Sequence, residues 1–180
     1  TKTTDASVTK TVSAAGTYYL TVQDTSGNVS ETQSVTFYKT TLNANGGSVS
    51  TTSKTVTYDS AYGTLRTPTR KGYPFVGWYT AASSGTKVTE STKVQTASNH
   101  TLYAHWTPNT YGVTLNTNGG TINSGNVTSY TYGTGATLPT DVTKTGYTFG
   151  GWYASADFSD SAVTTVDTTE IGEKTYYAKW

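Results

Sequence analysis

Short apolar–polar alternations separated by turn-forming residues run through the first part of the chain. In TYYLTVQ (17–23) every second residue, beginning at Tyr18, falls on one side of an extended backbone, which is the period of a half-buried strand. The residues that follow, DTSGN, each favour a turn, and 32–37 returns as a second strand. We predict a hairpin here, preceded by a short strand at 8–12, and a hairpin of two strands is marginally stable alone.

From residue 38 onward the sequence repeats itself. GYPFVGWY (72–79) returns as GYTFGGWY (146–153), and LYAHW (102–106) returns as YYAKW (176–180). Both tryptophans of the first copy recur after the same interval, 74 residues (152 − 78 and 180 − 106). Landmarks that keep one period indicate a tandem repeat. We therefore predict three parts, which are 1–37, 38–107 and 108–180.

The sequence of each copy predicts four strands. The predicted fold class is mainly β, or α+β at most. An Asn-Gly-Gly turn follows the first strand in both copies, at 45–47 and 118–120, and Asn-Gly favours a tight hairpin because both positions need positive φ. Pro68 and Pro139 are expected to end the second strand, and 69–73 is interpreted as one helical turn. The remaining strands are predicted at 54–58, 75–79 and 101–106 in the first copy and at 127–132, 149–153 and 175–180 in the second.

The paired aromatic motifs admit two interpretations. A module of about 70 residues needs large apolar side chains for its core, and this predicts a structural core of Tyr73, Phe75, Trp78, Trp106, Tyr147, Phe149, Trp152 and Trp180. Exposed aromatic residues are instead typical anchors for a partner. The tyrosines beside the tryptophans on the strands are the candidates for that role, namely Tyr79, Tyr103, Tyr153 and Tyr177.

Composition narrows the function. The net charge is +1 and 13% of residues are charged, so no basic surface for nucleic acid is indicated. No apolar run is long enough to span a membrane, and no signal peptide is visible. The sequence has no cysteine and no methionine, which suits exposure to oxidants. Because Thr1 opens directly on strand-like sequence and Trp180 closes a motif, we expect a fragment of a longer chain.

Candidate chemistry is sparse. His100 and His105 have no counterpart in the second copy, and no nucleophile motif accompanies them. A group of aspartates at 157, 160 and 167 offers oxygen ligands, but the spacing fits no calcium loop. Lysines and asparagines are plentiful, so Lys–Asn crosslinks stay open. We predict a protein that is not an enzyme and that has no cofactor or metal.

Two resemblances add to this interpretation. The segment G-x-Y-x-L-x-V before D-x-x-G-N, at 16–28, resembles the last strands of a bacterial immunoglobulin-like domain, where Tyr18 would be the tyrosine of the tyrosine corner. The two copies resemble the Listeria–Bacteroides repeat, with its NGG turn, GY-x-F-x-GWY motif and LYAxW ending. Pro74, His105 and Tyr176 depart from the usual pattern, and none of these changes a tryptophan.

The second resemblance implies β-grasp, ubiquitin-like modules in tandem on secreted or surface-anchored bacterial proteins, often beside immunoglobulin-like domains. We therefore expect an extracellular stalk that presents a distal domain and contacts neighbouring modules of its own chain. The alternative is an adhesion module whose aromatic residues bind a host protein or a glycan. Catalysis would need a domain outside these residues.

Overall fold

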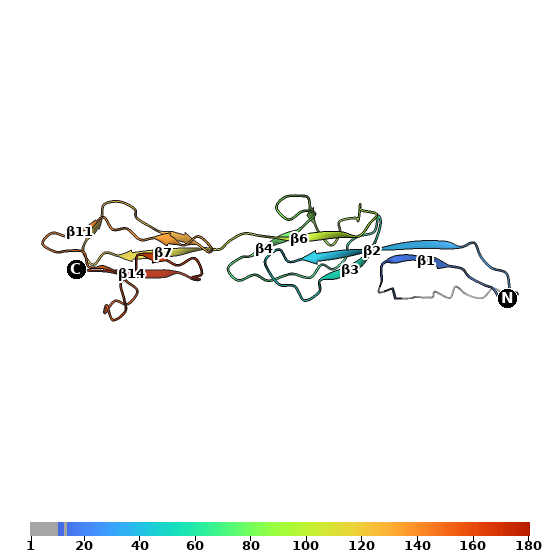
Figure 1. The fold of residues 1–180 in the computed structure, drawn as a ribbon, viewed down its shortest axis with the longest axis horizontal. Helices are drawn as coiled ribbons and strands as arrows, with labels where there is room; N and C mark the ends of the chain where they lie inside the picture. The colour runs from blue at the N-terminus through green and yellow to red at the C-terminus, as the bar shows by residue number, and fades with distance from the viewer. Residues whose placement is uncertain (1–10, 13) are drawn as a thin grey trace. The chain divides into compact units, whose positions relative to one another are not determined.

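The computed structural model describes residues 11–12 and 14–180. Figure 1 shows strands and loops throughout these residues, and none of the described residues lies in a helix. The prediction of a mainly β fold is confirmed. Of the strand expected at 8–12, residues 8–10 lie outside the described residues, and residues 11 and 12 are in no strand.

The chain forms two compact units. Of the described residues, the first comprises 11–12, 14–69 and 75–105, and the second comprises 70–74 and 106–180. The short segment 70–74 thus belongs, by its contacts, to the unit that follows it in the sequence. This feature could not be read from the repeat period, which placed the segment in the first module.

One sheet organises the first unit. Its strands are β1 (Gly16–Leu20), β2 (Gln33–Asn43), β3 (Ser53–Thr57), β4 (Phe75–Tyr79), β5 (Lys87–Val88) and β6 (His100–Trp106). They are ordered β1-β2-β6-β4-β5, with β3 also paired to β2. β2 runs antiparallel to β1 and β3 and parallel to β6.

The long strand β2 joins the predicted hairpin to the first repeat. Its first half pairs with β1, from Gln33 opposite Leu20 to Phe37 opposite Gly16. Its second half pairs with β3, beginning with Phe37 opposite Thr57. No break in the strand occurs at residues 37 and 38, where the sequence suggested a boundary (Figure 1).

The second unit repeats this pairing. Its main sheet has the order β12-β14-β7-β9, with β7 parallel to β14 and the other neighbours antiparallel. Two small two-stranded sheets flank it, β10 with β13 and β8 with β11. The bounds are β7 (Thr110–Asn116), β8 (Thr121–Ile122), β9 (Ser129–Thr131), β10 (Ala136–Thr137), β11 (Val142–Thr143), β12 (Gly151–Tyr153), β13 (Thr165–Val166) and β14 (Lys174–Lys179).

The Asn-Gly-Gly turns have the expected backbone but a different role. Asn45 has a φ of 47° and Asn118 a φ of 49°, and the next residue is also positive in both copies. However, β2 ends at Asn43 and β3 begins only at Ser53. The turn therefore opens a longer connection, and it is not the two-residue hairpin loop that the sequence suggested.

Candidate interaction surface

The tryptophans of the GWY motifs lie in the interior. The side chains of Trp78 and Trp152 are each 2% exposed. The Nε1–H group of Trp78 donates to the carbonyl of Arg66 at 3.1 Å, and that of Trp152 donates to the carbonyl of Pro139 at 2.7 Å. A buried tryptophan whose only polar atom is paired contributes its full apolar area to the core. These two residues are therefore unavailable to a partner.

The other predicted core residues are less uniform. Phe149 and Trp180 are half-buried, and their ring centroids are 5.5 Å apart. The Trp180 Nε1–H group donates to the Thr117 carbonyl at 2.8 Å. Their counterparts Phe75 and Trp106 are also half-buried. Tyr147 is 61% exposed, so the core assignment of this residue is corrected. Tyr147 lies in a turn before β12, and the strand predicted at 149–153 is shorter in the structure, at Gly151–Tyr153.

The four candidate tyrosines lie on the side of each sheet opposite the core. In β6, Leu102 and Ala104 are fully buried, so Tyr103, which lies between them, points the other way. In the second unit Tyr153 is directly opposite Tyr177, which pairs on its other side with Asn116. All four tyrosines, Tyr79, Tyr103, Tyr153 and Tyr177, are half-buried.

Neighbouring side chains cover part of these rings. The ring of Tyr79 stacks on that of His105, with 3.8 Å between centroids and 8° between planes. His105 Nε2 lies 2.9 Å from the Ala81 carbonyl, to which it donates. In the second copy the ammonium group of Lys179 lies 5.1 Å from the Tyr153 ring, and Phe158 meets that ring edge-on. A cation or an imidazole thus occupies the same position over the tyrosine in each repeat.

His100 takes part in a structural hydrogen-bond network. Its Nδ1–H group donates to the Ser98 carbonyl at 2.9 Å, while Nε2 lies 3.0 Å from Thr40 Oγ1 and 2.8 Å from the Tyr62 hydroxyl. Burial raises the pKa of Tyr62. The ring therefore links β2, β6 and the segment after β3, and its hydroxyl partner Thr40 is fully buried.

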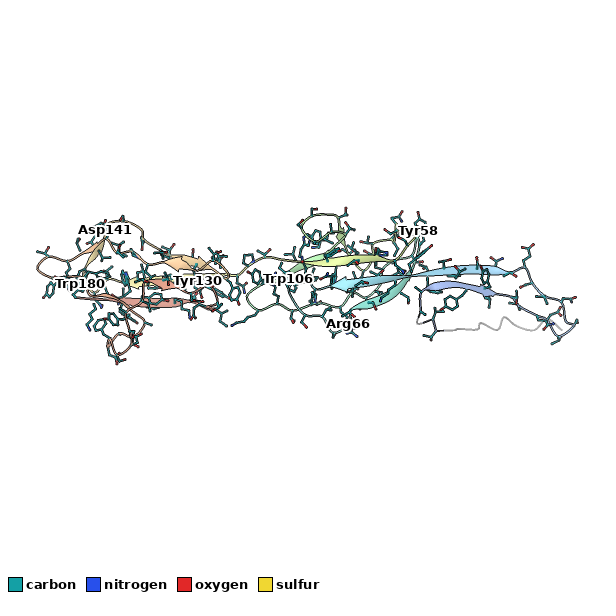
Figure 2. The ribbon with its side chains drawn as sticks, viewed as in Figure 1. Tyr58, Arg66, Trp106, Tyr130, Asp141 and Trp180 are labelled. Atoms are coloured by element: carbon teal, nitrogen blue, oxygen red, sulfur yellow. The ribbon has the colours of Figure 1, made fainter. Side chains whose placement is uncertain are left out.

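A lysine occupies the equivalent place in the second repeat. Lys174 forms an ion pair with Glu170, and this hydrogen bond raises the pKa of the ammonium group. The nearby Tyr130 is 2% exposed and donates to the Gly172 carbonyl at 2.6 Å, and burial raises its pKa. Figure 2 places Tyr130 and Trp180 toward opposite ends of this unit, so the network lies at the end away from Trp180.

The three aspartates of the second repeat do not converge. Asp157 accepts from Ser159, Asp167 accepts from Thr169, and Asp160 accepts from the backbone of Ala154 and Ser155. Hydrogen bonds of this kind lower the pKa values of Asp157 and Asp167. Over residues 11–12 and 14–180, no group of three or more acidic, histidine or cysteine side chains has the geometry of a metal site.

The described part of the chain also has no helix with the length and apolarity needed to cross a lipid bilayer. No solved structure matches the sequence. Similar sequences do exist. Internalin H of Listeria monocytogenes is 41% identical over 86 residues, which is 48% of this chain and 15% of the relative.

Two further relatives come from Evansella cellulosilytica. One, described as a Gly-rich membrane protein, is 31% identical over 153 residues, or 81% of this chain and 16% of the relative. The other, described as a membrane protein, is 30% identical over 154 residues, or 81% of this chain and 21% of the relative. The matched part of the chain therefore spans only 15% to 21% of the length of these three relatives.

The family model of the Listeria-Bacteroides repeat domain matches residues 38–105 and again 111–179. Each match contains the residues through which the first and last strands of a repeat pair in parallel. The chain belongs to the Listeria-Bacteroides repeat family and carries two copies of the repeat in tandem.

Proposed function

We propose that this chain is a non-catalytic stalk segment of a bacterial surface protein, in which the repeats hold another domain at a distance and bear tension. The observation that carries this proposal is the parallel pairing of the first and last strands of each repeat, β2 with β6 and β7 with β14. The names of the relatives, an internalin and two membrane proteins, favour a location at the cell surface.

Parallel terminal strands suit a load-bearing module. Tension draws the first strand toward its beginning and the last strand toward its end. Because the two strands are parallel neighbours, they are pulled past each other, and all the hydrogen bonds of the ladder are loaded together. A repeat built in this way resists extension until the whole ladder fails. This order of strands is also that of a β-grasp sheet, and we propose that each repeat is a β-grasp module without its helix.

Single-molecule force spectroscopy on the 180-residue chain, held at its two ends, tests the stalk role. We expect one discrete force peak for each repeat, each releasing about 240 Å of chain at about 3.5 Å per residue. Trp152→Ala is expected to weaken or remove one peak and Trp78→Ala the other, so each variant is the control for its neighbour. Smooth extension of the parent chain without force peaks contradicts the proposal.

We also propose that the β1–β2 hairpin belongs to an immunoglobulin-like domain. Tyr18 and Leu20 lie on one face with Val35 and Phe37, while Thr17, Tyr19, Ser34 and Thr36 lie on the other. The apolar face is largely exposed. The Tyr18 hydroxyl donates to the Ala14 carbonyl at 3.1 Å, as a tyrosine corner does. A longer chain from the same protein that includes more preceding sequence is expected to protect Leu20 and Val35 from solvent.

Adhesion is a second candidate, favoured by the equivalent positions of the tyrosines in the two repeats. A Tyr–Tyr–Asn row crosses the outer face of the second sheet at Tyr153, Tyr177 and Asn116, with the amide beside the rings. A glycan or host protein that binds here is expected to lose affinity with Tyr177→Ser and to retain it with Tyr19→Ser, at unchanged melting temperature. Saturable binding of this kind on a glycan array or in a pulldown would favour adhesion over a purely mechanical role.

A further inference from the structure

Within the second unit, the turn at residues 70–74 packs against Tyr132. The Tyr73 ring meets the Tyr132 ring edge-on, at 5.4 Å between centroids. A Cβ atom on Gly72 would lie 2.3 Å from Cγ of Tyr132, and a Cβ atom on Gly133 would lie 2.5 Å from the Tyr73 hydroxyl. Tyr132 therefore packs against Gly72, which precedes Tyr73, and Tyr73 packs against Gly133, which follows Tyr132. Neither glycine has room for a side chain.

Backbone hydrogen bonds hold this arrangement in register. The Asn109 amide donates to the Gly72 carbonyl at 2.9 Å, and the Tyr132 amide donates to the Asn109 carbonyl at 2.8 Å. Asn109 thus links the turn to the residue that faces it. This accounts for the grouping of residues 70–74 with the second unit.

The second repeat builds the same turn, but the tyrosine there is exposed. The Tyr147 amide donates to the Lys144 carbonyl as the Tyr73 amide does to Arg70, and Gly146 has a φ of 80° where Gly72 has 75°. The Lys144 ammonium group lies over the Tyr147 ring as the Arg70 guanidinium lies over Tyr73. Yet Tyr147 is 61% exposed, and a Cβ atom on Gly146 would meet no atom within 4 Å.

An isolated surface tyrosine is ordinary in a soluble domain. Tyr147 differs because its backbone turn and its cation match those of a residue that does have a partner ring in the same molecule. We propose that the Gly146–Tyr147 turn is a docking surface for a further repeat of this family, received against a Tyr–Gly pair equivalent to Tyr132–Gly133.

The first repeat lacks this receiving pair. Tyr58 and Asp59 follow β3 as Tyr132 and Gly133 follow β9. Tyr58 is labelled in Figure 2 and is 52% exposed. Asp59 has a positive φ of 58°, as Gly133 does, but it carries the side chain for which there is no room beside a docked tyrosine. The first repeat therefore cannot accept such a turn. Along an array, the turn of one repeat docks on the Tyr–Gly pair of the repeat that follows it.

An extended chain tests this proposal. A second copy of residues 107–180 is placed directly after Trp180, which then stands where Trp106 stands, before the same Thr-Pro-Asn linker. The added copy carries Tyr147→Phe, so that only one Tyr147 is present. The reaction of Tyr147 with tetranitromethane is followed by peptide mass spectrometry. Tyr19, which is 74% exposed, is the reference in the same sample.

We expect Tyr147 to be nitrated several-fold more slowly in the extended chain than in the 180-residue chain, with Tyr19 unchanged. Gly133→Asp in the added copy is expected to restore the faster rate, because Asp59 shows that aspartate fits this backbone position. Slow nitration of Tyr130 in the peptide that carries this substitution shows that the added repeat is folded. Equal rates at Tyr147 in both chains overturn the proposal, as does slow reaction that Gly133→Asp leaves unchanged.

Discussion

Trp152 donates its indole Nε1–H to the Pro139 carbonyl at 2.7 Å in the interior of the second repeat. Trp78 makes the equivalent bond to Arg66 in the first. The bond joins the strand of the GWY motif to the segment that follows the second strand of the repeat. Each repeat thus uses its largest side chain both to fill the core and to fix the path of an otherwise irregular connection.

Substitution at Trp152 separates these two contributions. Trp152→Phe keeps a large ring but removes the donor, and we expect it to cost about 1–3 kcal/mol of unfolding free energy, because the buried Pro139 carbonyl loses its partner. Trp152→Ala also leaves a cavity and is expected to cost about 3–5 kcal/mol. Urea unfolding measures both. Tyr19→Ala, on the exposed hairpin, is the control, and equal costs for the three variants would contradict the burial of Trp152.

Gly120 is the position where added volume is least tolerated in the Asn-Gly-Gly turn of the second repeat. A Cβ atom there would lie 2.1 Å from Cζ2 of Trp180. We expect Gly120→Ala to destabilise the repeat by about 1–3 kcal/mol through overpacking. Gly112→Ala is the control, because Gly112, like Gly120, has no positive φ and an added Cβ there would meet only Glu173 side-chain atoms, at 3.8 Å or more. A smaller loss for Gly120→Ala than for Gly112→Ala in thermal unfolding would be against this account.

Asn118 combines a left-handed backbone with a side-chain bond to the closing strand. Its Nδ2 donates to the Ala178 carbonyl at 2.8 Å, and Asn45 makes the same bond to Ala104. Asn118→Gly keeps the backbone conformation and loses the bond, for which we expect about 1 kcal/mol. Asn118→Ala is expected to cost more, because a φ of 49° is unfavourable for alanine. Urea midpoints in the reverse order would contradict the backbone argument, and an unchanged midpoint in Asn118→Gly would show that the side-chain bond is of no consequence.

The lowered pKa of Asp141 predicts that the stability of the fold decreases at acidic pH. Hydrogen bonds, first from Asn123 and then from Ser124, hold the pKa of this exposed carboxyl below its usual range. A lowered folded-state pKa stabilises the fold above the unfolded-state pKa, and this contribution is lost as the pH falls through the folded-state value. NMR titration of the Asp141 carboxyl is expected to give a higher pKa in Asn123→Ala. An identical titration in both proteins would exclude the Asn123 bond as the cause.

Much of the repeat could be predicted from its sequence. The period of 74 residues located both GWY strands, and the need of a small module for large apolar side chains predicted interior positions for Trp78 and Trp152. β4, at Phe75–Tyr79, has the bounds that the alternation gave, and the first and last strands of each copy also lie where predicted, within a few residues. Local patterns were sufficient here because both strand faces have distinct environments.

Other features depend on contacts that no local pattern contains. Tyr147 has the same sequence context as Tyr73, so nothing nearby could show that one ring is packed and the other exposed. The helical turn expected at 69–73 is replaced by a tight turn with Gly72 at positive φ. The contact of Phe158 with Tyr153 joins a polar loop to a strand, and the sequence of that loop offered no signal for it.

The central claim is that each repeat closes its own interior around one tryptophan. Hydrogen exchange at the indole Nε1–H groups, followed by NMR in the intact chain, tests it most directly. We expect the Trp78 and Trp152 signals to exchange far more slowly than free indole, and at rates that follow the unfolding free energy of their own repeats. Exchange of either signal as fast as that of free indole would contradict the claim.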